Sequence, residues 1–139
     1  MTKKELANSL HDKKYNCAQS VACAFASDLN IDPQILFKLC EGFGFGMGCA
    51  NGTCGAISGA VALLGLLNSD GNLEAPASKA DTYQLSKELL LKFEAKNNST
   101  ICRELKGIDT GRVLRSCPGC IEDAVEIVEE ILKNLKYRT

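Results

Sequence analysis

The chain has 139 residues, of which 45% are hydrophobic and 24% charged, and its formal net charge is -1. This balance is typical of one folded globular domain and excludes a disordered chain, so we predict a single domain over residues 1–139. Because no excess of positive charge is available to attract phosphate groups or anionic lipids, nucleic acid and membrane partners are not expected.

Helix signals begin near the N-terminus. Apolar residues at helical spacing predict a short amphipathic helix over residues 2–13. The only histidine, His11, is expected at its surface, and a single histidine excludes a His-rich zinc site. Asn16 is a good N-cap for a second helix, from Cys17 to about Leu29. In the first turn of that helix, unpaired amides and the helix dipole stabilise a thiolate at Cys17.

A third helix and a glycine-rich segment follow. Asp32 and Pro33 predict a helix that ends near Glu41, with Ile35, Leu36 and Leu39 packing inward. The next segment cannot hold a regular helix, because alternating glycines cost too much conformational entropy. They allow positive φ angles or a close approach of backbone to a ligand. The candidate cofactor-binding glycines are Gly44, Gly46 and Gly48.

The second half of the chain is predicted to contain the centre of the fold. Between Cys54 and about Leu67, small residues recur every four positions, so another helix can approach closely. A long helix is expected over 78–97, with Ala80, Tyr83, Leu90 and Phe93 on its buried face. A short segment over 100–105 and a loop over 108–116 follow, and Cys117 opens a last helix with a continuous apolar stripe.

No stretch alternates with the period of a β-strand. We therefore predict an all-α bundle of about five to six helices around a buried glycine- and alanine-rich central helix.

Eight cysteines are the most unusual feature of the composition. The chain is too long and too apolar to need a disulfide frame. Its basic first residues are followed by no apolar stretch, so no secretory signal is seen and a cytoplasmic location is expected. In a reducing compartment, so many thiols indicate metal binding or redox chemistry.

Four cysteines are placed where such chemistry is favoured. Cys17, Cys54 and Cys117 each fall at or just before the first turn of a predicted helix, and Cys102 lies in a short segment after a helix break. Convergence of several helix N-termini builds an electropositive pocket suited to anionic sulfur clusters or reactive thiols. A thioredoxin motif and a dinucleotide fingerprint are excluded, since both need a preceding strand.

The same cysteines carry a resemblance to a known family that covers nearly the whole chain. The matching segments are 15–21, the glycine loop 42–48, 54–60, 102–105, Cys117-Pro118 and 121–124. They resemble the putative redox-active proteins with the C_GCAxxG_C_C pattern, also found as a domain joined to split-Soret cytochromes. The resemblance implies a helical fold, redox activity and shared thiols at Cys17, Cys54, Cys102 and Cys117. The cytochrome-linked relatives suggest an iron–sulfur centre.

The other four cysteines match none of the family's motif positions. Cys23 and Cys40 are expected to pack as small apolar residues. Cys49 lies in the glycine loop five residues before Cys54, and Cys120 completes a CxxC sequence with Cys117. Both are possible accessory thiols of the same site.

Three functions stay open at this point. The first is an electron carrier in which Cys17, Cys54, Cys102 and Cys117 bind an iron–sulfur cluster or zinc. The second is a thiol–disulfide enzyme without a cofactor, with Cys54 or Cys117 as the attacking thiolate. The third is a helical binding module with structural cysteines. An electron-transfer or thiol partner protein is expected, and the glycine-faced helix and the C-terminal stripe would also serve a homodimer.

Overall fold

The computed structural model describes residues 1–136, which pack around one hydrophobic core. These residues form helices and no β-sheet, which confirms the predicted all-α class. Their only β-type pairing is an isolated bridge between Thr53 and Ile101. The elements are α1 (Lys3–Asp12), α2 (Cys17–Ala24), α3 (Pro33–Cys40), the 3-10 turn η1 (Glu41–Phe43), α4 (Gly44–Gly48), α5 (Gly55–Asn68), α6 (Lys79–Asn97), α7 (Cys102–Lys106) and α8 (Cys117–Lys136).

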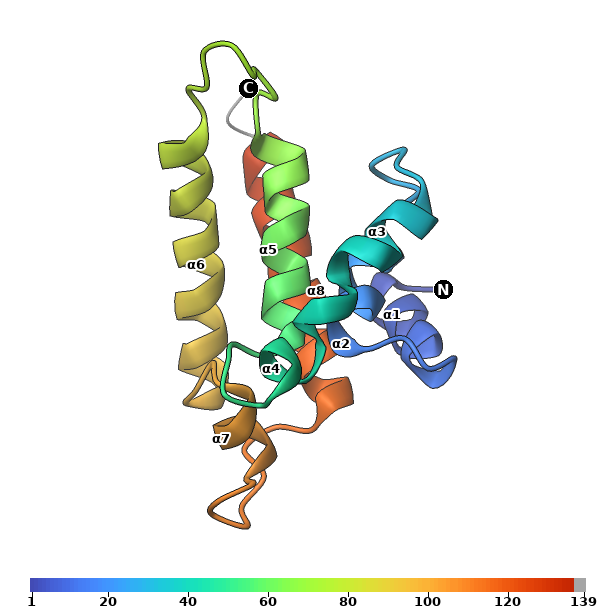
Figure 1. The fold of residues 1–139 in the computed structure, drawn as a ribbon, viewed down its shortest axis with the longest axis vertical. Coiled ribbons are helices and arrows are strands. Elements are labelled where there is room, and N and C mark those ends of the chain that lie inside the picture. Colours follow the sequence, from blue (N-terminus) through green and yellow to red (C-terminus); the bar gives the residue numbers. More distant parts are fainter. Residues whose placement is uncertain (137–139) are drawn as a thin grey trace.

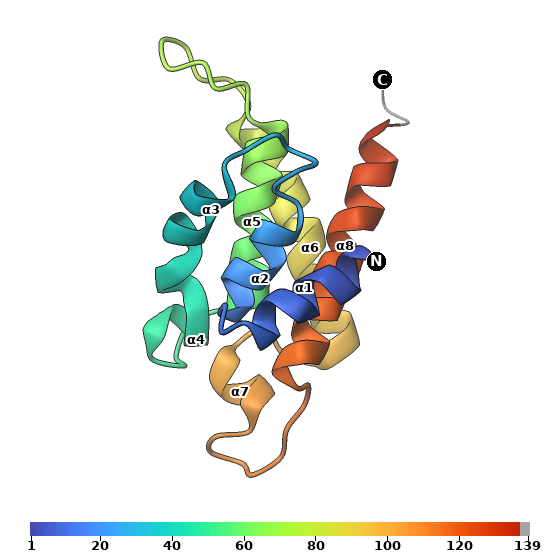
Figure 2. The ribbon, with the colours of Figure 1, turned by 90° about the vertical axis from the view of Figure 1, so that its right-hand side faces the viewer.

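Helix α5 is the centre of the fold, as predicted. Helices α5, α6 and α8 run along the long axis of the molecule, and α1, α2 and α3 lie on one side of them (Figures 1 and 2). Helix α5 packs against α2, α6 and α8, while α4 and α7 lie at the lower end in Figure 1. The N-terminal ends of α5 and α8 therefore come together with α7 at one end of the molecule.

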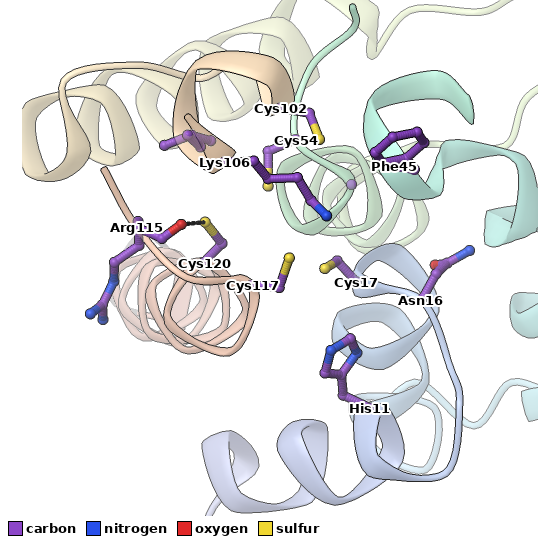
Figure 3. A pocket seen from close by; sticks show the side chains of 12 residues that line it. His11, Asn16, Cys17, Phe45, Cys54, Cys102, Lys106, Arg115, Cys117 and Cys120 are labelled. Atoms are coloured by element: carbon purple, nitrogen blue, oxygen red, sulfur yellow. Dashed lines mark hydrogen bonds between the residues drawn. The ribbon is translucent and has the colours of Figure 1, made fainter. Parts of the chain in front are cut away.

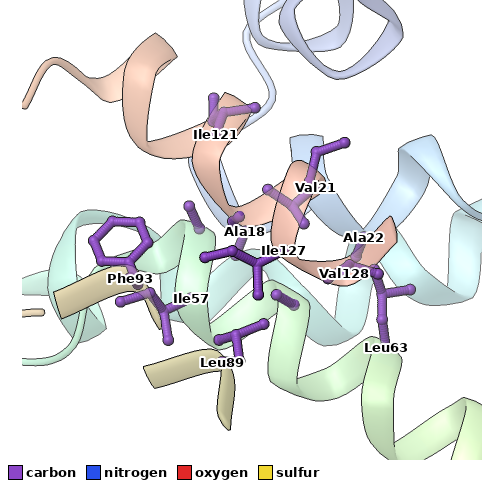
Figure 4. Close-up of a cluster of buried hydrophobic side chains, with 14 of the residues drawn as sticks. Ala18, Val21, Ala22, Ile57, Leu63, Leu89, Phe93, Ile121, Ile127 and Val128 are labelled. Atoms are coloured by element: carbon purple, nitrogen blue, oxygen red, sulfur yellow. The ribbon is translucent and has the colours of Figure 1, made fainter. Parts of the chain in front are cut away.

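The close contact between α2 and α5 depends on Gly59. A Cβ atom at this position would lie 2.5 Å from the carbonyl oxygen of Ala18 and 2.9 Å from its Cα atom. Ala18, Val21 and Ala22 of α2 are fully buried in the cluster of Figure 4. The absence of a side chain at Gly59 thus brings the first turn of α2, which carries Cys17, against the central helix.

Gly59→Ala is expected to destabilise the protein by about 2–3 kcal/mol, because overpacking a rigid backbone contact costs on the order of 1–3 kcal/mol. Urea unfolding followed by circular dichroism measures the change. Gly65→Ala in the same helix is the matched control. Its Cβ meets nothing within 4 Å, so it should raise stability by roughly 0.5–1 kcal/mol. Equal effects of the two substitutions would contradict this account of the contact.

Several predicted details of the helices are wrong. Helix α2 ends at Ala24 rather than near Leu29, since residues 25–30 form successive turns. In α3 the inward side chains are Leu36 and Cys40, whereas Ile35 and Leu39 are 53% and 62% exposed. Helix α3 has eight residues and buries only one narrow face. That face contains Leu36 and Cys40, which are four residues apart.

The predicted buried face of α6 is also wrong, apart from Phe93. Its buried residues are Leu85, Leu89, Phe93 and Asn97. Ala80, Tyr83 and Leu90 are exposed. Three consecutive leucines at 89–91 fit more than one helical face, and the packing against α5 and α8 selects the face of Leu89.

Candidate functional site

Five of the eight cysteines line one cavity of about 180 Å3. The cavity lies where the N-terminal ends of α2, α5 and α8 meet α7, and Figure 3 shows its side chains. The cysteines are Cys17, Cys54, Cys102, Cys117 and Cys120. Four segments far apart in the sequence therefore supply thiols to one place.

Cys17 is placed by the start of α2. It is the first residue of the helix, and Asn16 before it forms a capping box with Gln19, with both hydrogen bonds at 2.9 Å. The side-chain amide of Asn16 donates to the Glu41 carbonyl oxygen, and that of Gln19 donates to the Phe37 carbonyl oxygen. These contacts fix the first turn of α2 against the segment that leads into the glycine loop.

Cys54 and Cys102 are held together by the isolated bridge. The Cys54 amide donates to the Thr100 carbonyl oxygen at 2.8 Å, and the Cys102 amide donates to the Gly52 carbonyl oxygen at 3.0 Å. Cys54 is the N-cap of α5, and Cys102 is the first residue of α7. The bridge thus brings two residues that are distant in the sequence to adjacent helix ends.

Cys117 and Cys120 belong to the first turn of α8. Ser116 accepts hydrogen bonds from the following backbone: its hydroxyl from the Gly119 amide at 3.1 Å, and its carbonyl oxygen from the Cys120 amide at 2.9 Å. Cys117 is half-buried and Cys120 is buried. Of the two predicted accessory thiols, Cys120 lines the cavity and Cys49 does not.

The glycine loop supports the cavity through its backbone shape. Phe45, Gly46, Met47 and Gly48 all have positive φ angles, between 53° and 78°, so the chain makes a left-handed turn in α4. A Cβ at Gly46 would lie 2.5 Å from the Cβ of Cys102. Gly44, Gly46 and Gly48 do not line the cavity. Gly46 allows Cys102 to pack closely, and Phe45 supplies its side chain to the wall.

Cys23, Cys40 and Cys49 lie outside the cavity. The Cys23 thiol contacts the Pro33 carbonyl oxygen at 3.7 Å, and Cys40 is fully buried in the core. Cys49 is exposed, with its sulfur 3.8 Å from the Gly46 carbonyl oxygen. His11, expected at the surface, lines the cavity, and its Nδ1 lies 3.0 Å from the Tyr15 carbonyl oxygen.

Cys17 and Cys117 form the first pair of neighbouring thiols in the cavity. Their side chains lie next to one another in Figure 3. A hydrogen bond donated by the Cys17 thiol lowers the pKa of Cys117 to about 6, with the nearby charge of Lys106 acting in the same direction against the effect of burial. The same hydrogen bond, together with burial, raises the pKa of Cys17. Cys117 is therefore the thiol of this pair that loses its proton more readily.

Cys54 and Cys120 form a second pair, deeper in the cavity. A hydrogen bond from the Cys120 thiol lowers the pKa of Cys54, and the backbone amides of Ala56 and Ile57 help. That contact and burial raise the pKa of Cys120. In the structure the Cys120 thiol donates to the Arg115 carbonyl oxygen at 3.9 Å (Figure 3). The pKa of Cys102 is raised, chiefly by burial.

Two cationic side chains at the cavity were not predicted from the sequence. The Lys106 ammonium group lies 5.1 Å from the centre of the Phe45 ring. Arg115 makes two hydrogen bonds to Asp123, at 3.0 and 3.2 Å, and Asn97 donates to the same carboxylate at 3.0 Å. The hydrogen bonds from Arg115 to Asp123 hold the loop before Cys117 against α8. The sequence does not predict the contacts of Arg115, because an acidic residue such as Asp123 near the start of a helix is expected at the surface.

Asp123→Asn is expected to lower stability by about 1–3 kcal/mol, because hydrogen bonds to a charged group contribute on the order of 1.5–3 kcal/mol. Burial raises the pKa of Asp123, but the hydrogen bonds from Arg115 and Asn97 outweigh it and the net pKa is lowered. Its contribution is therefore complete above the unfolded pKa of about 3.9 and is lost as the pH falls through the folded value. Urea unfolding at pH 7 and pH 3 measures this, and the variant should lose less stability on acidification. An unchanged pH dependence would contradict the account.

A metal site is not formed by the side chains as they stand. Within residues 1–136, no group of three or more His, Cys, Asp or Glu side chains is placed to hold a metal ion. The thiols of the cavity instead meet in pairs. In the same part of the chain, no helix is long and apolar enough to cross a membrane.

The fold and the site together define a class: a helical protein in which cysteines from separate helix N-termini meet in one cavity. The model of the family described as "Putative redox-active protein (C_GCAxxG_C_C)" matches residues 15–131. The chain belongs to this family, as its cysteine pattern predicted. No match was found among curated proteins or among solved structures.

Proposed function

We propose that the protein carries out two-electron thiol–disulfide chemistry, with Cys117 as the attacking thiolate and Cys17 as the resolving thiol. The observation that carries the proposal is that these two residues, both half-buried, lie next to one another in the wall of one cavity (Figure 3). A thiolate is the nucleophile in disulfide exchange, and a thiol whose pKa lies near ambient pH attacks most effectively.

The reaction begins when the Cys117 thiolate attacks one sulfur of a partner disulfide. The second partner sulfur leaves as a thiolate and takes up a proton. In the mixed disulfide Cys117 no longer carries negative charge, so the main cause that raised the pKa of Cys17 disappears. Cys17 then loses its proton and attacks the Cys117 sulfur. The partner leaves as a dithiol, and the protein holds a Cys17–Cys117 disulfide.

A second hollow beside the cavity supports a protein partner. It has a volume of about 540 Å3 and is bounded by apolar Phe45, Ile108 and Val113 and by cationic Lys106 and Arg115. It also reaches Cys117, so a segment bound there would present its disulfide to that sulfur. A cytoplasmic location belongs to the same proposal, because a reducing compartment keeps the thiols available.

Peptide mapping after oxidation tests the proposal. One equivalent of a disulfide-closed synthetic peptide is added to the Cys120→Ser variant, in which no second disulfide between Cys54 and Cys120 can form. Remaining thiols are alkylated at low pH, and tryptic peptides are analysed by mass spectrometry. We expect a Cys17–Cys117 cross-link that disappears on reduction. Cys23→Ser is the control, since Cys23 shares a tryptic peptide with Cys17 but lies outside the cavity. Alkylation of both Cys17 and Cys117 after oxidation would contradict the proposal and favour a binding module.

An iron–sulfur cluster or a zinc ion is our second proposal, supported by the convergence of five thiols on one cavity. Cys17, Cys54, Cys102 and Cys117 would hold it, once their side chains turn from the paired arrangement toward a common point. A cluster would supply one-electron transfer. Iron and zinc analysis and a visible spectrum of protein purified without oxygen test this proposal. Colourless protein that contains neither metal would contradict it.

Cys102→Ser separates the two proposals. Four-sulfur binding uses Cys102, so the substitution should abolish or strongly weaken metal retention if the second proposal holds. The thiol mechanism does not use Cys102, so the Cys17–Cys117 cross-link should form in this variant at the wild-type rate. Loss of the cross-link in a folded Cys102→Ser variant would count against the mechanism as written.

A further inference from the structure

We propose that Cys54 and Cys120 form a second, buried dithiol that receives the disulfide from Cys17 and Cys117. This inference rests on the proposed thiol–disulfide function. It assigns a role to Cys120, which lies outside the motif positions of the family pattern. The protein would then act as an internal relay that moves oxidation from its surface to its interior.

The two pairs differ in access. Cys54 is 6% exposed and Cys120 is 2% exposed, whereas Cys17 and Cys117 are both half-buried. The cavity of about 180 Å3 cannot admit a folded partner or a peptide loop. A protein disulfide can therefore react at Cys117, while the deeper pair can be oxidised by such a partner only through another thiol of this chain.

The two pairs share one wall, so exchange between them needs no large movement. Cys117 and Cys120 are three residues apart on α8, and residues at this spacing lie on one face with Cβ atoms about 5–6 Å apart. Cys54 projects from the N-cap of α5 into the same cavity (Figure 3). Cys54 therefore lines the same cavity as the first turn of α8, which carries Cys117 and Cys120.

Cys54 is also prepared to attack. It is the N-cap of α5, a helix of 14 residues. At this position its sulfur lies at the positive end of the helix dipole, which favours the thiolate form of a cysteine. The attacking group of the relay is therefore built into the start of the central helix.

The relay consists of two exchange steps. The Cys54 thiolate attacks the Cys117 sulfur of the Cys17–Cys117 disulfide, and Cys17 leaves as a thiolate that takes up a proton. Cys120 then loses its proton, and its thiolate attacks the Cys54 sulfur. The Cys54–Cys117 bond breaks, and Cys117 leaves as a thiolate. One disulfide is consumed and one is formed, so no additional oxidant or reductant is needed.

Time-resolved disulfide mapping tests the relay. Reduced protein is mixed with one equivalent of the disulfide-closed peptide, samples are quenched in acid and alkylated, and the cross-linked peptides are measured. Trypsin leaves Cys117 and Cys120 in one peptide, so fragment ions between them must assign each bond. In the wild type we expect the Cys17–Cys117 cross-link first, followed by a rise of Cys54–Cys120 as the first one falls.

Two variants make the test specific. In Cys117→Ser the buried pair is intact but the surface thiolate is missing, so the Cys54–Cys120 cross-link should form at least tenfold more slowly. In Cys120→Ser the disulfide should stay at Cys17–Cys117. Cys49→Ser, which removes an exposed thiol outside the cavity, should behave as wild type. Circular dichroism checks that each variant is folded.

The outcomes separate this inference from the function on which it rests. If Cys17–Cys117 accumulates and Cys54–Cys120 never forms, the relay is wrong and the surface chemistry stands. If Cys54–Cys120 forms in Cys117→Ser at the wild-type rate, the relay is also wrong, because oxidation then enters by another route. If no Cys17–Cys117 cross-link forms, the relay and the proposed function both fail.

Discussion

Replacing Cys17 by alanine is expected to raise the pKa of Cys117 from about 6 toward the ordinary range of thiols. The hydrogen bond from Cys17 is the largest cause of the lowered pKa of Cys117. Alanine has no donor, and the half-buried position of Cys117 then disfavours the thiolate. At pH 7 the fraction of Cys117 in the thiolate form should therefore be several-fold lower in the variant than in the wild type.

Alkylation by iodoacetamide between pH 4 and pH 10, followed on the Cys117 peptide, measures this pKa. The midpoint of the rate profile is the appropriate readout, because a low-pKa thiolate is also intrinsically less nucleophilic and the rate at one pH understates the change. Lys106→Met should move the midpoint in the same direction but less, since Lys106 is a lesser cause. Cys49→Ala should leave it unchanged. A wild-type midpoint near 9 would show that the pair does not exist in solution.

Oxidation is expected to stabilise the protein by about 4–5 kcal/mol through the Cys17–Cys117 disulfide. The two cysteines lie one hundred residues apart in the sequence, and closing a loop of that length removes entropy from the unfolded chain worth about 4.7 kcal/mol in the chain-entropy model. Urea unfolding of the oxidised and reduced protein, followed by circular dichroism, measures the difference. The Cys120→Ser background confines the disulfide to this pair.

Cys17→Ser in that background is the matched control, and its stability should not depend on the redox state. A gain close to zero in the parent, with the cross-link verified by mass spectrometry, would mean that the disulfide strains the native helices by as much as it restrains the unfolded chain. In that case the arrangement of Cys17 and Cys117 in the reduced protein would not fit a disulfide without distortion of the helices.

The helices and the convergence of thiols could be predicted from local signals in the sequence. Asn16 and Asp32 are N-caps in the structure, and Cys54 lies at the start of the central helix as expected. Such signals work because capping and glycine spacing depend on neighbours in the chain. The placement of Cys17, Cys54 and Cys117 at helix N-termini followed from the same rules, which is why their common environment was foreseeable.

The pairing of the thiols could not be predicted in this way. Which sulfur faces which depends on the bridge between Thr53 and Ile101 and on the packing of α8 against α2 and α5. Lys106 and Arg115 were missed for the same reason, since their positions at the cavity come from a five-residue helix and an irregular loop. The spacing of apolar residues also did not predict the buried face of α6, because its three consecutive leucines fit more than one helical face.

A redox titration of the Cys17–Cys117 cross-link tests the central claim most directly. The Cys120→Ser variant, in which the disulfide cannot pass to Cys54 and Cys120, is equilibrated with graded ratios of reduced to oxidised dithiothreitol without oxygen, quenched in acid and mapped by mass spectrometry. We predict that the cross-linked fraction rises and falls reversibly with the slope of a two-electron couple. The account would be contradicted if Cys17 and Cys117 remained separately alkylated at every ratio while the protein stayed folded.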